Sequence, residues 1–197
     1  MNPLPYLLVL VATVAADKIP SYVVPGKCPV VDQTKLWAQQ VPNHAKYAGV
    51  WYQIALTETL FQPLSQCVLN EYSFGEKQFN VISSGVSAEG SLLKIHGKVY
   101  PSPVGEPELS VDFQQSFPAP YVILKTDYTN YACVYSCIGL NSDYYTDVAF
   151  ILARSPTPED RFVKQCEDTF KSINFDTSRL TKTVQGSACD YDNQKAL

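Results

Sequence analysis

The chain has 197 residues, a net charge of −4 and a sequence isoelectric point near 5.1. This length suits a single domain that can bury a substantial core. Its lysines and arginines are scattered and form no basic run, which argues against nucleic acid and anionic membrane surfaces as partners. Composition therefore indicates one domain whose partners are not recognised through positive charge.

The N-terminus resembles an export signal. An apolar stretch from Leu7 to Val14 is followed by two small residues, Ala15 and Ala16. This pattern is typical of a signal peptide and is too short to span a membrane. We therefore predict a signal peptide over residues 1–16, cleavage after Ala16, and a secreted, extracellular domain over residues 17–197.

Six cysteines in an exported chain indicate three disulfides. They are Cys28, Cys67, Cys133, Cys137, Cys166 and Cys189. Free core thiols are the alternative, and zinc is disfavoured because the chain has neither a CxxC pair nor a close histidine pair. Cys133 and Cys137 stand four apart in an apparent strand, so their Cα atoms lie about 13 Å apart. A disulfide spans less than about 7 Å. Excluding that bond leaves twelve of the fifteen pairings that six cysteines allow.

After the predicted signal peptide, a proline-rich segment up to Pro42 suits an extended wrap with at most a short helix near Gln33–Gln39. From Val50 onward, short apolar or alternating runs rich in Val, Ile, Tyr and Phe are separated by turn residues, a pattern typical of strands. The predicted strands are Val50–Leu56, Cys67–Phe74, Gln78–Ser83, Leu92–Tyr100, Glu108–Phe113, Tyr121–Thr126, Ala132–Ile138 and Thr146–Leu152. Short connections, with one longer loop over Thr57–Gln66, favour an antiparallel meander. Eight such strands close into a barrel with room for one small ligand.

A helix follows the strands. Thr157-Pro158-Glu159-Asp160 is a helix-start pattern in which Thr157 would cap the first turn. Phe162, Val163, Cys166 and Phe170 then form one apolar stripe at helical spacing. We therefore predict an all-β fold: an eight-stranded antiparallel up-and-down barrel with one C-terminal α-helix packed outside. Cys166 would face a strand, and a last short strand would cover Leu180–Val184.

Alternation along the first three strands places uncharged polar side chains on the same faces as apolar ones. These faces carry Trp51, Gln53 and Ala55, then Val68, Asn70, Tyr72 and Phe74, then Phe79, Val81 and Ser83. A sealed core rarely combines Gln, Asn, Tyr and Ser, because buried polar groups need partners. A cavity for a mostly apolar ligand with polar ends accommodates them. The alternative is that they bond backbone groups or water.

Three short motifs occur in order along the strands. Gly49-Val50-Trp51 opens the first strand, Thr126-Asp127-Tyr128 lies between the sixth and seventh, and Arg154 follows the eighth. Their order and spacing resemble those of the lipocalins. In that family the tryptophan closes the barrel floor and the arginine packs across its ring, a cation–π contact. The resemblance implies structural roles for Gly49, Trp51, Thr126, Asp127, Tyr128 and Arg154.

Within the lipocalins, the whole mature chain resembles the crustacyanin subunits. The resemblance is carried by the six cysteine positions and by Asp17–Pro20, Val24–Cys28, Tyr47–Gln53, Asn70–Phe74, Thr126–Cys133 and Lys182–Ser187. It implies the bridges Cys28–Cys137, Cys67–Cys189 and Cys133–Cys166. It further implies bound astaxanthin or a similar carotenoid, no catalytic cofactor, and assembly with another lipocalin subunit into hetero- or homodimers and larger coloured complexes.

The resemblance also implies a ligand site. Gln53, Asn70, Tyr72 and Ser83 match polar residues around a carotenoid end ring in similar subunits, and they are the residues that alternation points inward. Two further ligand-binding positions depart from the pattern. Glu108 stands where similar subunits often carry His, and Phe113 stands where they carry Tyr. Because Phe donates no hydrogen bond and an ionised Glu only accepts, these departures affect colour tuning more than binding.

Catalysis has little support in the sequence. The two histidines are far apart, and no free cysteine is expected, so no nucleophile–base pair and no metal site is predicted. His96 alternates with Lys94 and Lys98 and is expected to face solvent. An enzyme acting on lipids would need a free thiol, which a thiol count detects. The nearer alternative is a carrier of another apolar ligand, a retinoid, bilin or fatty acid, since apolipoprotein D and insect bilin binders share the three motifs.

Overall fold

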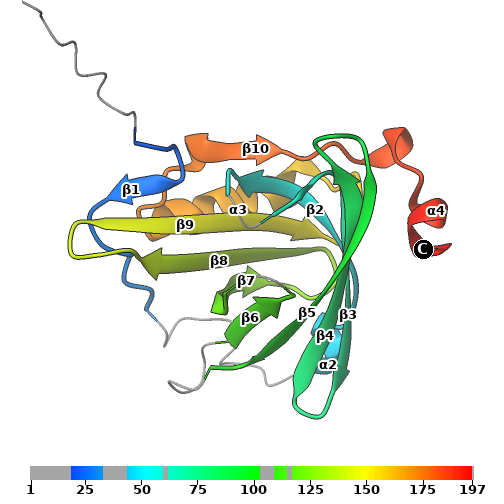
Figure 1. The fold of residues 1–197 in the computed structure, drawn as a ribbon, viewed down its shortest axis with the longest axis horizontal. Coiled ribbons are helices and arrows are strands. Elements are labelled where there is room, and N and C mark those ends of the chain that lie inside the picture. The colour runs from blue at the N-terminus through cyan, green and yellow to red at the C-terminus, as the bar shows by residue number, and fades with distance from the viewer. Residues whose placement is uncertain (1–18, 33–43, 60–61, 103–108, 115–116, 197) are drawn as a thin grey trace, which may run out of the picture.

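The structure is a computed structural model that describes residues 19–32, 44–59, 62–102, 109–114 and 117–196. Over these residues, eight antiparallel strands follow one another and close into a barrel when β9 pairs back onto β2 (Figure 1). The strands are β2 (Gly49–Thr57), β3 (Leu64–Gly75), β4 (Gln78–Ser87), β5 (Leu92–Pro101), β6 (Leu109–Phe113), β7 (Ala119–Thr126), β8 (Tyr131–Gly139) and β9 (Tyr144–Ala153). The predicted barrel is confirmed. The predicted signal peptide and the short helix near Gln33–Gln39 lie outside the described residues.

Several strands are longer than their apolar patterns predict. β3 begins at Leu64, inside the predicted loop Thr57–Gln66, and β4 continues to Ser87. The extensions interrupt the apolar pattern with polar residues, but their backbone still pairs, with Leu64 opposite Ser87 and Gln66 opposite Val86. Ladder hydrogen bonds define where a strand ends, so a polar side chain that breaks the apolar pattern need not end the strand.

Two short strands extend the barrel wall where β2 ends. β1 (Val23–Pro25) pairs with the start of β9, and β10 (Leu180–Lys182) pairs with the end of β2 (Figure 1). β10 is shorter than the predicted strand, because Val184 instead bridges to Gln66 on β3. The remaining helical elements are α2 (His44–Tyr47), η2 (Thr177–Arg179), η3 (Gly186–Ala188) and α4 (Tyr191–Ala196). No helix in the described ranges has the length and apolar character needed to cross a membrane.

The predicted C-terminal helix is α3 (Asp160–Ser172), and it packs outside the barrel against β7, β8 and β9. Its apolar stripe buries Cys166 and Phe170 completely. The predicted cap is wrong: Glu159 is the N-cap, and no side chain caps the first turn. The Thr157 N–H instead donates to the Ser155 hydroxyl, so Thr157 belongs to a turn that precedes the helix.

All six cysteines are bonded. The bridges are Cys28–Cys137, Cys67–Cys189 and Cys133–Cys166, the pairing that the crustacyanin resemblance implies. Each joins the barrel to a segment outside it: the N-terminal wrap, the C-terminal segment and α3, respectively. These bridges hold both ends of the domain against the barrel wall.

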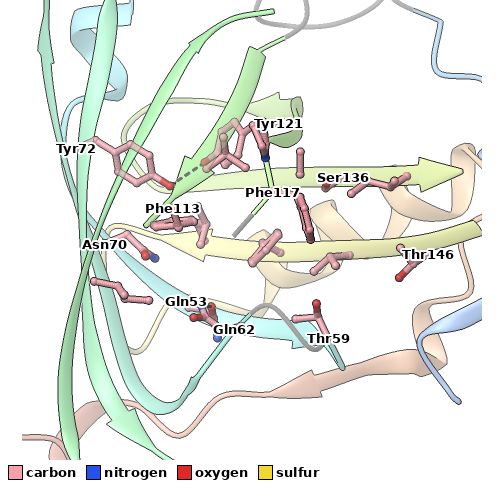
Figure 2. Close-up of a pocket in the computed structure, with 18 of the residues that line it drawn as sticks. Gln53, Thr59, Gln62, Asn70, Tyr72, Phe113, Phe117, Tyr121, Ser136 and Thr146 are labelled. Carbon is pink, nitrogen blue, oxygen red and sulfur yellow. Dashed lines mark hydrogen bonds between the residues drawn. The ribbon is translucent and has the colours of Figure 1, made fainter. Parts of the chain in front are cut away.

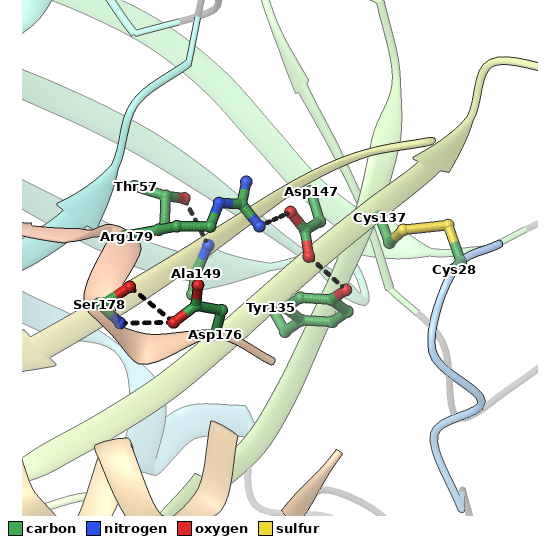
Figure 3. A network of polar contacts seen from close by, with 9 residues as sticks. All are labelled: Cys28, Thr57, Tyr135, Cys137, Asp147, Ala149, Asp176, Ser178 and Arg179. Carbon is green, nitrogen blue, oxygen red and sulfur yellow. Dashed lines mark hydrogen bonds and ion pairs between the residues drawn. A yellow bond between two sulfur atoms is a disulfide. The ribbon is translucent and has the colours of Figure 1, made fainter. Parts of the chain in front are cut away.

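A buried ion pair also holds the C-terminal segment to the barrel. Asp147 on β9 is 1% exposed and accepts hydrogen bonds from Arg179 of η2 at 2.7 Å and from the Tyr135 hydroxyl at 2.9 Å (Figure 3). The guanidinium carbon of Arg179 also lies 5.3 Å from the centroid of the Phe175 ring. This network provides hydrogen-bond partners for the buried carboxylate on the outer face of β8 and β9.

One inward-facing assignment is wrong because β2 contains a bulge. Gln53 pairs with Leu152 and Ala55 with Ile151, so Ile54 is an extra residue in the ladder. Ile54 and Ala55 both belong to the outer core beneath α3. Ala55 therefore does not share the inner face with Trp51 and Gln53, as simple alternation predicts.

Candidate ligand-binding site

The three motifs meet at one end of the barrel. The Trp51 ring is fully buried, and the Arg154 guanidinium carbon lies 3.7 Å from its centroid. Arg154 also donates to the backbone carbonyls of Lys46, Tyr47, Ala48, Val50 and Tyr128. A Cβ on Gly49 would come within 3.3 Å of this guanidinium, and Gly49 has a positive φ of 97°. Position 49 therefore favours glycine, and the floor of the barrel is closed.

The Thr126-Asp127-Tyr128 motif forms the turn beside this floor. The Asp127 carboxylate accepts from the backbone N–H groups of Thr129, Asn130 and Tyr131. Burial favours a higher pKa for Asp127, but the side-chain hydrogen bond from Asn130 and these backbone bonds bring the pKa below its ordinary value. The motif shapes the turn between β7 and β8; Tyr128 packs against the inner core, and none of the three residues lines the cavity.

Above the floor the barrel encloses a cavity of about 390 Å³. Most of its lining is apolar, from strands on every side. Among the apolar lining residues are Ile95, Phe113, Phe117, Ile138 and Leu140. Phe117 and Leu140 follow β6 and β8 at the end opposite Trp51, and they are 78% and 51% exposed. The cavity is therefore closed at the Trp51 end and has an apolar mouth.

Three buried tyrosines from distant parts of the chain meet near the floor. The Tyr121 hydroxyl lies 2.9 Å from that of Tyr47 and 2.8 Å from that of Tyr72, and the contact between Tyr72 and Tyr121 is visible in Figure 2. Burial raises the pKa of Tyr72 to about 12 and the pKa values of Tyr47 and Tyr121 well above 10.0. All three phenols are therefore protonated at neutral pH.

The structure places four of the six predicted ligand-binding residues on the cavity: Gln53, Asn70, Tyr72 and Phe113. Ser83 is buried but does not line the cavity; it lies opposite Asn70 in the β3–β4 ladder and donates to Asn70 Oδ1 at 2.6 Å. Glu108 lies outside the described residues. The alternative expected these polar groups to bond backbone groups or water, but all four hydrogen-bond other side chains: Ser83 bonds Asn70, Gln53 bonds Thr183, and Tyr72 bonds Tyr121.

Sequence reasoning missed several polar residues of the cavity, among them Tyr121, Gln62, Ser136 and Thr146. Alternation contained a signal for two of them. Ser136 is two residues from Ile138 on β8, and Thr146 is two from Val148 on β9, and all four line the cavity. His96 is exposed, as predicted. No local pattern distinguishes Gln62, which lies in the connection between β2 and β3.

Near the closed end of the cavity, Asn70, Gln53 and the tyrosine cluster each keep a hydrogen-bond donor available. Because Asn70 Oδ1 accepts from Ser83, the amide nitrogen of Asn70 is turned to the cavity (Figure 2). The amide of Gln53 donates to Thr183 at 3.1 Å and accepts from Gln62 at 3.3 Å, so one amide hydrogen remains. Three phenols joined by two hydrogen bonds also leave one O–H proton without an acceptor among the described groups.

Neither a metal centre nor a nucleophile is assembled by the residues that the structure describes. No group of three or more His, Cys, Asp or Glu side chains is arranged to hold an ion. Every cysteine is in a disulfide. The arrangement can enclose an apolar molecule and offer hydrogen-bond donors to one end of it.

A closed antiparallel barrel with an internal cavity, an arginine stacked on a floor tryptophan and an outer helix defines a lipocalin. The chain matches the model of the lipocalin-like domain over residues 43–185, and it belongs to the lipocalin family. Lipocalins are binding proteins rather than enzymes, and this chain is one of them.

Within that family the chain closely resembles the crustacyanin subunits. It is 59% identical to the crustacyanin-C1 subunit of Homarus gammarus over 181 residues, which cover 92% of this chain and 100% of the relative. The structure of lobster apocrustacyanin A1 superposes with a TM-score of 0.87 at 58% identity, covering 91% of this chain and 100% of that one. Apolipoprotein D of Macaca fascicularis is 35% identical over 153 residues, 76% of this chain and 79% of the relative.

Proposed function

We propose that this protein is a secreted pigment-binding lipocalin that holds a keto-carotenoid, astaxanthin or a similar molecule, in its barrel. The observation that carries the proposal is the polarity of the cavity: its walls are apolar, and hydrogen-bond donors remain available at its closed end. A keto oxygen is an acceptor, and a polyene is apolar, so a keto-carotenoid matches both parts of the cavity. The close similarity to crustacyanin subunits supports the same ligand class.

Gln53, Asn70 and Tyr72 are proposed to meet the polar end of the ligand. Asn70 offers its amide N–H groups, Gln53 one amide N–H, and the tyrosine cluster one O–H. Phe113 contributes apolar contact, and Ser83 acts by orienting Asn70.

The ligand is proposed to be shared with a second lipocalin subunit. A cavity of about 390 Å³ is small for a molecule with two end rings, so one ring would extend past Phe117 and Leu140 at the mouth. Exposed apolar surface costs roughly 25 cal/mol per Å² in water. Covering that half with another lipocalin subunit, identical or different, would remove this cost and build the coloured complex.

Reconstitution with astaxanthin and with β-carotene, which lacks keto groups, tests the ligand assignment. We expect astaxanthin to bind with a red-shifted absorption spectrum. Asn70→Leu and Tyr72→Phe should each weaken astaxanthin binding by about tenfold, as expected for one lost hydrogen bond of about 1–1.5 kcal/mol, and should affect β-carotene little.

Asn80→Leu is the matched control, because Asn80 is exposed on β4, outside the cavity. Equal losses for both carotenoids would contradict the donor role. Tight binding of retinol, biliverdin or oleic acid with no binding of astaxanthin would instead favour a carrier of another apolar ligand. Sedimentation tests the sharing: a saturated protein that stays monomeric and keeps a shifted spectrum has a self-contained pocket.

A further inference from the structure

Gly97 occupies an inward-facing position in the middle of the barrel wall. It lies on β5 between Ile95, which lines the cavity, and Val99, which is buried in the inner core. Its partners across the ladder are Val81 on β4 and Phe113 on β6. Alternation along β5 therefore directs a side chain at position 97 into the barrel.

The space that such a side chain would fill is taken by Phe113. A Cβ built on Gly97 would lie 2.5 Å from Cδ1 and 2.7 Å from Cε1 of Phe113, and 3.0 Å from the Asp112 carbonyl oxygen. The first two distances are shorter than van der Waals contact permits. The Phe113 ring therefore lies across the backbone of β5, against the wall of the cavity that it lines.

Backbone conformation does not explain a glycine here. Gly97 is not among the glycines with positive φ, and its backbone is that of an ordinary strand, which any residue can adopt. Glycine weakens a strand interior and often marks a place where another group approaches closely. At Gly97 that group is the ring of Phe113. The ring lies where a side chain at position 97 would otherwise be, and the cavity is wider as a result.

We propose that Gly97 and Phe113 together set the width of the cavity and so select ligands with a broad cyclic end over slim acyclic chains. The inference rests on the proposed function, because it assumes that the cavity holds the ligand's end group. A methyl group at position 97 would also lie 3.0 Å from the Asp112 carbonyl oxygen, so it cannot turn away from the ring on that side. The ring then has to move into the cavity, where it narrows the space for a substituted six-membered ring.

A pair of isomeric probes tests the selection. β-Ionone carries the cyclic end group of a carotenoid with an adjoining enone, and pseudoionone is its acyclic isomer with the same enone. Binding of each is followed by quenching of tryptophan fluorescence, and astaxanthin binding is followed by absorption. We expect the wild type to prefer β-ionone and Gly97→Ala to lower that preference by roughly tenfold or more, as one misplaced methyl group does in apolar pockets.

Two variants make the test specific. Adding Phe113→Leu to Gly97→Ala removes the displaced ring and should restore the preference for β-ionone. Gly139→Ala adds a methyl group where no atom lies within 4 Å and should change nothing. Thermal unfolding of each variant separates a narrowed cavity from a damaged fold.

The outcomes distinguish this inference from the proposed function. If astaxanthin binds the wild type but Gly97→Ala leaves the preference unchanged, or weakens both isomers equally with a lower Tm, the width selection is wrong and the carotenoid assignment stands. If the wild type binds neither astaxanthin nor β-ionone, the proposed function is wrong, and the inference fails with it.

Discussion

Polar side chains on the two faces of the β8–β9 hairpin differ in whether they have hydrogen-bond partners within the protein. On the outer face, Tyr135 and Asp147 are buried and bonded to each other and to Arg179. On the inner face, Ser136 and Thr146 line the cavity, and no described protein group forms a hydrogen bond with either hydroxyl. The strands are the same, and only the alternation of their side chains differs.

The difference separates stability from binding. A buried carboxylate without a partner destabilises a fold, so the outer face completes its network with a cation from the C-terminal segment. The inner face keeps polar groups whose partners are water or a ligand. Substitutions on the outer face should therefore change unfolding, and substitutions on the inner face should change what is bound.

The largest expected effect is on the outer face. Asp147→Ala removes the partner of Arg179 and of the Tyr135 hydroxyl, and should lower the free energy of unfolding by about 3–5 kcal/mol. Urea denaturation measures it. Asp168→Ala is the control, because its i,i+4 pair with Lys164 is exposed and such pairs contribute less than about 1 kcal/mol. If Asp147→Ala and Asp168→Ala lowered the free energy of unfolding equally, the stabilising role of the buried outer-face network would be contradicted.

An effect of intermediate size should appear at high pH through the tyrosine cluster. Burial raises the folded pKa of Tyr72 to about 12 and also raises those of Tyr47 and Tyr121, while an unfolded tyrosine titrates near 10. The unfolded state therefore loses protons first. The stability that the cluster provides is complete below about pH 10 and is lost as the pH rises through about 12.

Tyr72 alone should account for roughly 2–3 kcal/mol of this loss. Chemical denaturation at several alkaline pH values measures it, and Tyr121→Phe should make the profile flatter. A stability that does not change over this range would mean that the phenols are accessible to water, and the closed end of the cavity would then be open.

The smallest expected effect sharpens the comparison within the inner face. Ser83→Ala removes the donor to Asn70 Oδ1 and lets the amide rotate, so astaxanthin binding should weaken about fivefold, less than for Asn70→Leu. The binding of β-carotene should not change. Ser73→Ala, at an exposed position on β3, is the control. A loss as large as that of Asn70→Leu would indicate direct contact between Ser83 and the ligand.

Much of the fold and part of the site could be predicted from local pattern. Alternating runs identified the eight strands, and their parity correctly placed Gln53, Asn70 and Tyr72 on the inner face. Parity failed at Ala55, because one extra residue in β2 reverses the faces beyond it. The ladder that β2 forms with β9 decides the presence of a bulge, so the sequence of β2 alone does not reveal it.

The sequence by itself determined which residues form strands, which face most of them present, and that the cysteines would be oxidised. Only the tertiary structure decided which of those residues meet. Tyr121 joins Tyr47 and Tyr72, which are 74 and 49 residues away, and Arg179 reaches Asp147 across 32 residues. Gly97 makes room for Phe113 on the neighbouring strand. Side-chain periodicity specifies a face along one strand, whereas contacts across a closed barrel depend on the register and stagger of all its strands.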